Sequence, residues 1–265
     1  MSKRANREYS PAWRRATTIL FPPLIRSMMK RDWRGHEHIP REGGVIVAVN
    51  HLSYADWAAV ALFIYQAGRY PAFLIKSSVF DIKVLGPFLR TCGQLPVNRG
   101  HADAALVLRD AERGVQRGEC LVFYPEGTAT RDPALWPMVA KTGVARVALA
   151  TGVPVVPVAH WGAQEILPYG TTKFHLVPRR TVRMLAGPPV DLSAYRDQPM
   201  NRDVLRAATN AIMADITGLL AELRGEPAPA TAYDPAAARR AARDEQSAGG
   251  TRPSGEEEPK KATPA

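Results

Sequence analysis

Short apolar runs alternate with stretches of helical periodicity between residues 35 and 225, and this alternation constrains the fold more than any other feature. The run Val45–Val49 has the length of a buried strand, and the apolar stretch at 57–65 that follows it is typical of a helix. Strands that alternate with helices build α/β domains. The sequence therefore predicts one α/β domain over residues 35–225.

Other segments extend this pattern along the chain. Asn201 is a candidate N-cap, and Pro154 and Pro157 predict that the strand containing them is not hydrogen-bonded along both edges throughout. The further candidate strands are 73–75, 95–97, 121–124, 153–159 and 182–185, and the further candidate helices are 104–118, 144–150 and 201–225.

The composition changes at residue 226. From there to residue 265 the chain is rich in Pro, Ala, Glu, Arg, Gly and Ser, and large apolar side chains are almost absent after Tyr233. Such a segment lacks the apolar surface needed to offset the loss of chain entropy on folding. We therefore predict a disordered tail over residues 226–265.

The net charge of +10 indicates an acidic partner, which is nucleic acid, an anionic membrane surface or a phosphorylated substrate. Residues 1–41 carry ten cationic and three acidic side chains, so +7 of the excess is N-terminal. A basic, non-enzymatic binder of nucleic acid or membrane is one interpretation. It rests on charge alone, because no helix-turn-helix, zinc-finger or aromatic RNA-binding signature is present.

Basic and apolar side chains alternate over residues 12–33, within a predicted basic segment 1–34. This mixture suits an amphipathic helix in the lipid headgroup region. Two alternatives are a secretory signal, which Pro22 and Pro23 disfavour, and a helix that only docks on the domain. Because no run reaches about 18 apolar residues, we expect peripheral attachment to the cytoplasmic face of the cell membrane.

The chain contains two cysteines, Cys92 and Cys120, without Cys-x-x-Cys spacing or nearby histidine clusters. This pattern predicts neither a disulfide framework nor a zinc site. A reducing cytoplasm fits such cysteine usage.

The segment from Asn50 to Asp56 lies where the first predicted strand passes into a helix. Ligands of open α/β sheets collect at the carboxyl ends of strands, so His51 is well placed to meet a substrate. A tight turn would let Asp56 accept a hydrogen bond from one imidazole nitrogen and leave the other nitrogen to take a proton. The alternative is structural: Ser53 and Asp56 also match a capping box, with His51 as a structural histidine.

Asn-His-x-Ser-x-x-Asp resembles the first motif of the glycerolipid acyltransferases, the family of bacterial 1-acylglycerol-3-phosphate acyltransferases. Further segments resemble that family's motifs in the family's order, over roughly residues 35–192. They are 93–99, which ends in Arg99, then Tyr124-Pro125-Glu126-Gly127-Thr128, then Lys141 with Gly143, and the apolar Val-Pro-x-x-Pro segment at 153–158.

The resemblance implies a glycerol-3-phosphate acyltransferase-like fold, with a central mixed, mostly parallel sheet flanked by helices. It implies that His51 and Asp56 are catalytic and that Arg99 grips the substrate phosphate. It also implies that substrate binding involves the third motif and the basic-glycine segment, through Glu126, Gly127, Thr128 and Lys141. From its position at a strand end, Glu126 would accept from a substrate hydroxyl or align Arg99, or serve as a turn carboxylate.

Two positions depart from the family pattern. Tyr124 replaces the usual phenylalanine, which is a mild change. Ala129 stands where the family carries arginine, and Arg131 follows two residues later, where its side chain need not point the same way. The second departure leaves the second phosphate contact open, and with it the identity of the acceptor.

The expected reaction is transfer of a fatty acyl group from acyl-CoA or acyl-carrier protein to the sn-2 hydroxyl of 1-acylglycerol 3-phosphate. His51 would act as general base, and no metal or redox cofactor is required. Ser53 is a poor candidate nucleophile because it lacks the Gly-x-Ser-x-Gly elbow. The same chemistry on glycerol 3-phosphate, another lysophospholipid or an amino-lipid remains an alternative.

Overall fold

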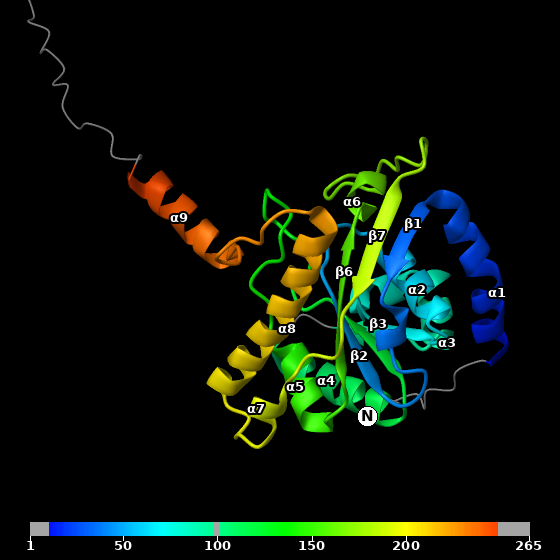
Figure 1. Cartoon of the computed structure of the whole chain (residues 1–265), viewed down its shortest axis with the longest axis horizontal. Helices are drawn as coiled ribbons and strands as arrows, with labels where there is room; N and C mark the ends of the chain where they lie inside the picture. Colours follow the sequence, from blue (N-terminus) through cyan, green and yellow to red (C-terminus); the bar gives the residue numbers. More distant parts are fainter. Residues whose placement is uncertain (1–10, 98–100, 249–265) are drawn as a thin grey trace, which may run out of the picture. The chain divides into compact units, whose positions relative to one another are not determined.

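A computed structural model describes residues 11–97 and 101–248 (Figure 1). The helices are α1 (Pro11–Met28), α2 (Asp56–Gln66), α3 (Leu85–Thr91), α4 (His101–Gln116), α5 (Gly143–Thr151), α6 (Ala163–Ile166), α7 (Ser193–Arg196), α8 (Arg202–Arg224) and α9 (Pro235–Ala248), with 3-10 turns η1 (His36–His38) and η2 (Ser77–Asp81). The strands are β1 (Lys30–Arg34), β2 (Val45–Val49), β3 (Pro71–Lys76), β4 (Leu95–Val97), β5 (Cys120–Phe123), β6 (Val155–Trp161) and β7 (Thr181–Ala186).

The strands form one sheet in the order β1-β7-β6-β2-β5-β3-β4. The pairs from β6 to β4 are parallel, β7 runs antiparallel to β6, and β1 is parallel to β7. The predicted mixed, mostly parallel α/β fold is confirmed, and each strand and helix expected between residues 35 and 225 is present to within three residues.

Strand β2 lies at the centre of the sheet and is buried on both faces. Alternate side chains of a strand point to opposite faces, so Val45, Val47 and Val49 join one core cluster while Ile46 and Ala48 join the other. A continuous Val/Ile/Ala run is what such a doubly covered strand requires.

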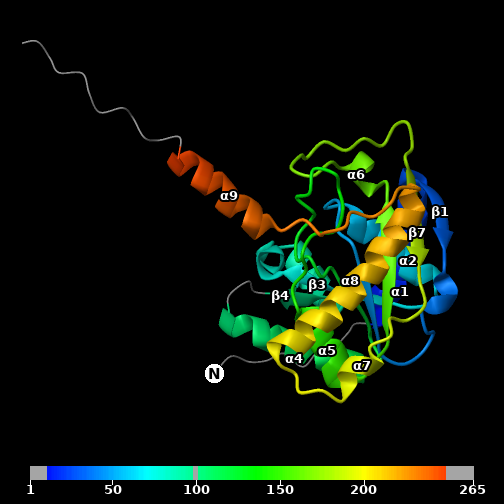
Figure 2. The same cartoon turned by 60° about the vertical axis from the view of Figure 1, so that its left-hand side comes forward.

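Helices cover both faces of the sheet, with α1 and α2 on one side and α4, α5 and α8 on the other (Figures 1 and 2). Among the described helices, α8 has the length and hydropathy of a membrane-spanning helix. Its apolar side chains nevertheless line the core along one stripe, which includes Leu205, Ala208, Ile212, Ile216 and Leu220. Its hydropathy therefore reflects packing on the sheet.

The N-terminal segment contains a helix and a strand. Helix α1 continues through Pro22 and Pro23, although neither proline has an N–H to donate to the preceding turn. Residues 30–34, which we expected to extend the amphipathic helix, instead form the edge strand β1 against β7. Four of its five residues are exposed and most are charged, so the strand has no apolar pattern to reveal it.

The compact unit extends to Tyr233, eight residues past the expected boundary, because the Val139 N–H donates to the Tyr233 carbonyl at 2.9 Å. A second unit begins at Asp234 and contains α9, within the tail that we expected to be disordered. The Asp234 carboxylate accepts from the Ala236 N–H at 2.7 Å and caps this alanine-rich helix.

Candidate active site

Three adjacent parallel strands, β6, β2 and β5, bring ionisable residues to the same edge of the sheet. His51 follows β2, Glu126 follows β5 after a two-residue turn, and His160 is the penultimate residue of β6. The carboxyl ends of parallel strands are where open α/β sheets bind their ligands. The topology therefore gathers residues that are far apart in the sequence, such as Asn50 and His160, which are 110 positions apart.

His51 and Asp56 are in direct contact. Nδ1 of His51 lies 2.9 Å from Oδ2 of Asp56, the first residue of α2. The Asp56 side chain is fully buried, whereas the His51 side chain keeps 15% of its surface exposed. The carboxylate therefore fixes the ring from the protein interior, as expected for a base and its orienting partner.

Three hydrogen bonds converge on Oδ2 of Asp56. Besides His51, the backbone N–H of Leu52 donates at 2.8 Å, and Nε2 of His160 lies at 3.1 Å. Burial by itself raises the pKa of Asp56, but the charges and hydrogen bonds of His160 and His51 outweigh it and hold this pKa well below its ordinary value. Asp56 is therefore a carboxylate at neutral pH.

The capping-box interpretation of Ser53 and Asp56 is wrong. Asp56 directs its carboxylate at Leu52 and the two histidines, and no side-chain cap is present at the start of α2. The Ser53 hydroxyl donates to the carbonyl of Leu167 at 2.6 Å and accepts from the Ala55 N–H at 3.0 Å. Ser53 is thus buried in a structural turn.

Tyr124 stacks on the imidazole of His51. The ring centroids are 4.4 Å apart, and the planes are inclined by 27°. Any aromatic ring satisfies this contact, which explains why tyrosine can stand where the motif carries phenylalanine.

Glu126 supports the backbone of His51. Its Oε1 accepts from the His51 N–H at 3.0 Å and its Oε2 accepts from the Met138 N–H at 2.9 Å, and the residue is 4% exposed. Burial raises the pKa of Glu126 to about 7, although both backbone hydrogen bonds lower it. Both oxygens are thus engaged by the protein, which makes Glu126 a brace between the first and third motifs.

Lys141 lies over Gly127. The glycine has a φ of +74°, and a Cβ placed on it would come within 3.3 Å of the lysine Nζ. The Lys141 N–H also donates to the Pro125 carbonyl at 2.9 Å. The exposed Lys141 side chain therefore lies against the third motif, beside a glycine whose positive φ other residues rarely adopt.

A polar and aromatic rim extends outward from His51. The Tyr54 ring lies 6.2 Å from the His51 ring and 5.5 Å from the ring of Tyr169. The pKa of the Tyr169 hydroxyl is lowered, mainly by a hydrogen bond with Tyr54; burial opposes this shift, and Arg131 and Thr128 add to it. Arg131 thus reaches the rim of the site although it is two positions beyond Ala129.

Six of the expected site residues lie in segments that contact one another: His51, Asp56, Glu126, Gly127, Thr128 and Lys141. Arg99 lies outside the described residues. His160 did not emerge from the sequence as a site residue. Its one signal is its place near the end of a buried strand, two residues after the apolar proline motif.

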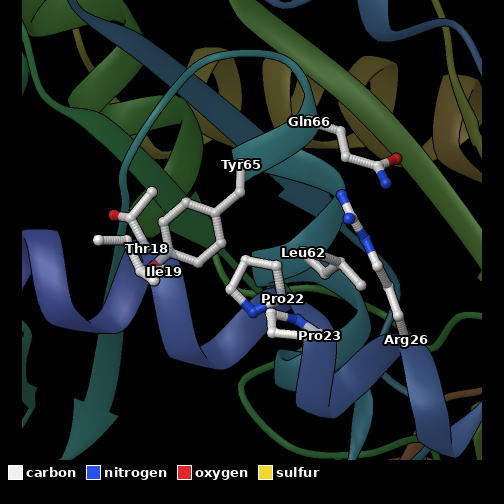
Figure 3. Close-up of a pocket in the computed structure, with 8 residues that line it drawn as sticks. All are labelled: Thr18, Ile19, Pro22, Pro23, Arg26, Leu62, Tyr65 and Gln66. Carbon is white, nitrogen blue, oxygen red and sulfur yellow. The ribbon is translucent and has the colours of Figure 1, made fainter.

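A hollow of about 280 Å³ lies elsewhere, between α1 and the C-terminal end of α2 (Figure 3). It contains none of the site residues expected from the sequence. Its lining consists of Thr18, Ile19, Pro22, Pro23, Arg26, Leu62, Tyr65 and Gln66.

Comparisons with known proteins agree with this architecture. A structure from Thermotoga maritima, titled as the 1-acyl-sn-glycerophosphate acyltransferase PlsC, superposes with a TM-score of 0.61 at 22% identity, covering 82% of this chain and 83% of that one. A chloroplast 1-acyl-sn-glycerol-3-phosphate acyltransferase of Brassica napus is 32% identical over 144 residues, which are 54% of this chain and 40% of the relative. A Bacillus subtilis protein of the same enzyme name is 23% identical, covering 66% of this chain and 81% of the relative.

The chain thus spans about two fifths of the length of the plant relative. The sequence profile of the Acyltransferase family matches residues 30–161, which include β1, the His51–Asp56 pair, Glu126 and His160. The fold, the site and this match agree, and the chain belongs to the acyltransferase family.

Proposed function

We propose that this protein transfers a fatty acyl group from acyl-CoA or acyl-carrier protein to the sn-2 hydroxyl of 1-acylglycerol 3-phosphate. The observation that carries the proposal is the 2.9 Å contact between His51 Nδ1 and the buried Asp56 carboxylate at the open edge of the sheet. The names of the plant and bacterial relatives support the choice of acceptor.

The Asp56 contact leaves Nε2 of His51 as the general base. Nε2 takes the proton of the acceptor hydroxyl while that oxygen attacks the carbonyl carbon of the thioester. The C–S bond then breaks, and the leaving thiolate takes this proton from His51 Nε2. The products are an ester and a free thiol. Asp56 stabilises the imidazolium between the two steps, a role for which its low pKa suits it.

The cations of the rim support a phosphorylated acceptor. Lys141 lies against Gly127, and Arg131 hydrogen-bonds to Tyr169 on the side of His51 that Tyr54 lines. In this proposal Arg131 supplies the guanidinium that Ala129 lacks, since a planar, permanently charged fork suits a phosphate.

Attachment to an anionic membrane surface, on the cytoplasmic face of the cell membrane, is a second part of the proposal. Helix α1 docks on α2 through Phe21, whose ring stacks on Trp57 at 5.5 Å, and through the buried Ile25. Its other face leaves Ile19, Leu20 and Leu24 between 59% and 70% exposed, with basic side chains nearby. The helix therefore supports both the docking and the membrane-surface interpretation of this segment. One of its faces packs on the domain, and the other is available to lipid.

The test is acyl transfer by the purified full-length protein, offered a labelled acyl donor with a panel of acceptors. The panel contains 1-acylglycerol 3-phosphate, glycerol 3-phosphate and a lysophospholipid without a terminal phosphate. We expect transfer to the first, and loss of transfer with a retained fold in His51→Ala. Transfer to none of the acceptors, or undiminished transfer by His51→Ala, would contradict the proposal.

A further inference from the structure

His160 is a second histidine bound to the Asp56 carboxylate. Its side chain is fully buried, and its Nε2 lies 3.1 Å from Asp56 Oδ2 and 2.9 Å from the carbonyl oxygen of Asn50. Both neighbours are acceptors, so the hydrogen of the ring lies on Nε2. Nδ1 is buried without a partner among the described residues, as suits a nitrogen without a hydrogen.

Asn50 holds His160 in place through both its side chain and its backbone. The Asn50 amide donates to the His160 carbonyl at 3.1 Å and accepts from the His160 N–H at 2.8 Å. These two side-chain bonds link Asn50 to β6 just beyond Val49 and Val158, the last backbone pair of β2 and β6. The imidazole of His160 is therefore positioned by the sheet itself, with little freedom to turn away from Asp56.

In this arrangement two imidazoles bind the same carboxylate oxygen of Asp56. Oδ2 of Asp56 accepts from His51, His160 and the Leu52 N–H, while Oδ1 is buried without a partner among the described residues. A donor on a buried carboxylate stabilises the anion and reduces the negative potential that it directs at its other partners. His160 therefore acts on His51 through Asp56, and since it is fully buried it does not touch the substrate.

We propose that His160 is a positioning residue for acyl transfer, which aims Asp56 at His51 and moderates the basicity of His51 by taking part of the carboxylate's charge. This inference rests on the proposed function only for its consequence in catalysis. Within residues 11–97 and 101–248, the other titratable groups that contact His51 are Tyr54 and Tyr124 at its ring and Glu126 at its backbone. They remain in place when His160 is replaced.

The test compares His160→Leu, which removes the donor, with His160→Gln, whose amide can donate from the place of Nε2. Val156→Ala, on the same face of β6, serves as the control for lost packing. The first readout is the carbethoxylation of His51 by diethyl pyrocarbonate as a function of pH, measured by peptide mass spectrometry. The reagent reacts with the neutral imidazole, and the measurement needs no acyl substrate. The second readout is the acid limb of kcat/KM for acyl transfer.

We expect the midpoint of His51 modification and the acid limb to move to higher pH in His160→Leu, by roughly one pH unit, the size of one hydrogen bond to a charged group. The sign follows because a carboxylate with fewer donors stabilises the His51 imidazolium more. His160→Gln and Val156→Ala should stay near the wild-type midpoint. A His160→Leu midpoint equal to that of the wild type would overturn the proposal, whether or not the rate has fallen.

The carbethoxylation result does not depend on the acceptor, so it separates a failure of this inference from a failure of the proposed function. If His160→Leu does not fold, wild-type protein with ¹⁵N-labelled histidine rings provides the decisive measurement. We expect the His160 hydrogen on Nε2 at neutral pH. A hydrogen on Nδ1 with a bare Nε2 would overturn the proposal, since Nε2 could then donate nothing to Asp56.

Discussion

The carboxylate of Glu126 accepts a hydrogen bond from the backbone N–H of His51 at 3.0 Å. The third motif therefore supports the backbone of the first, and the buried Glu126 ties His51 to the segment that contains Met138. This contact gives the glutamate a structural role behind the base. It also makes the stability of the site sensitive to the protonation of Glu126.

The first prediction concerns stability and pH. Burial raises the pKa of Glu126 from an ordinary value of 4.5 to about 7, so the folded protein binds this proton more tightly than the unfolded chain does. Its contribution is complete below the unfolded pKa and is lost as the pH rises through the folded one. From about pH 5 to about pH 8 the free energy of unfolding should fall by roughly 1–3 kcal/mol more in the wild type than in Glu126→Gln.

Urea unfolding of both proteins over this pH range measures the difference. The exposed control Glu42→Gln should follow the wild type. Asp56 does not interfere, because its lowered pKa removes stability only below its ordinary value of 3.8. Parallel pH curves for wild type and Glu126→Gln would contradict the raised pKa.

The second prediction concerns Asp56. Asp56→Asn keeps the shape of the side chain but removes the charge that stabilises the His51 imidazolium. We expect a folded protein whose transfer rate falls on the order of a hundredfold to ten-thousandfold. Steady-state rates and thermal unfolding by circular dichroism measure the two effects, and a rate near that of the wild type would show that the pair has no catalytic role.

The third prediction concerns Ser53. Its hydroxyl is committed to the Leu167 carbonyl at 2.6 Å, so we expect Ser53→Ala to keep most of its turnover and to lose about 1 kcal/mol of stability. Mass spectrometry of the wild type mixed with acyl donor alone should show no acylated serine. An acyl-Ser53 adduct would replace direct transfer with a covalent route.

The fourth prediction concerns Arg131. If its guanidinium binds the acceptor phosphate, Arg131→Ala should raise the KM for 1-acylglycerol 3-phosphate about tenfold and leave kcat nearly unchanged, because a charge-assisted hydrogen bond is worth about one decade in affinity. Arg146→Ala, at an exposed position on α5, is the matched control. An unchanged KM would assign the phosphate to other cations.

The fifth prediction concerns the outer face of α1. Replacing Ile19, Leu20 and Leu24 together by serine should reduce flotation with anionic vesicles about a hundredfold or more, since each buried side chain contributes about 1.5–3 kcal/mol. Deleting the whole N-terminal segment, residues 1–34, would be a poorer test, because the deletion would also remove β1 from its pairing with β7.

The control for the α1 variant carries serine at three exposed apolar positions elsewhere, Phe174, Val177 and Met200. This protein should float like the wild type. Equal flotation of the α1 variant and the wild type would exclude this helix face as the attachment site.

The elements that could be predicted from the sequence are those whose patterns are local. The apolar run of β2, the periodicity of α8 and the turn from His51 to Asp56 each depend on residues that are close in the chain, so the α/β class and the imidazole–carboxylate contact could be predicted. Strand β1 could not, because an exposed edge strand paired on one side needs no apolar alternation.

The order of the strands in the sheet, and with it the surroundings of His51, depends on contacts between residues that are far apart in the chain. The order β6-β2-β5 places His160 against Asp56 and Glu126 behind His51. These contacts join residues 104 and 75 positions apart, and no local pattern encodes them. Burial then shifts the pKa of both carboxyl groups, because desolvation depends on everything packed around a group and not on its neighbours in the sequence.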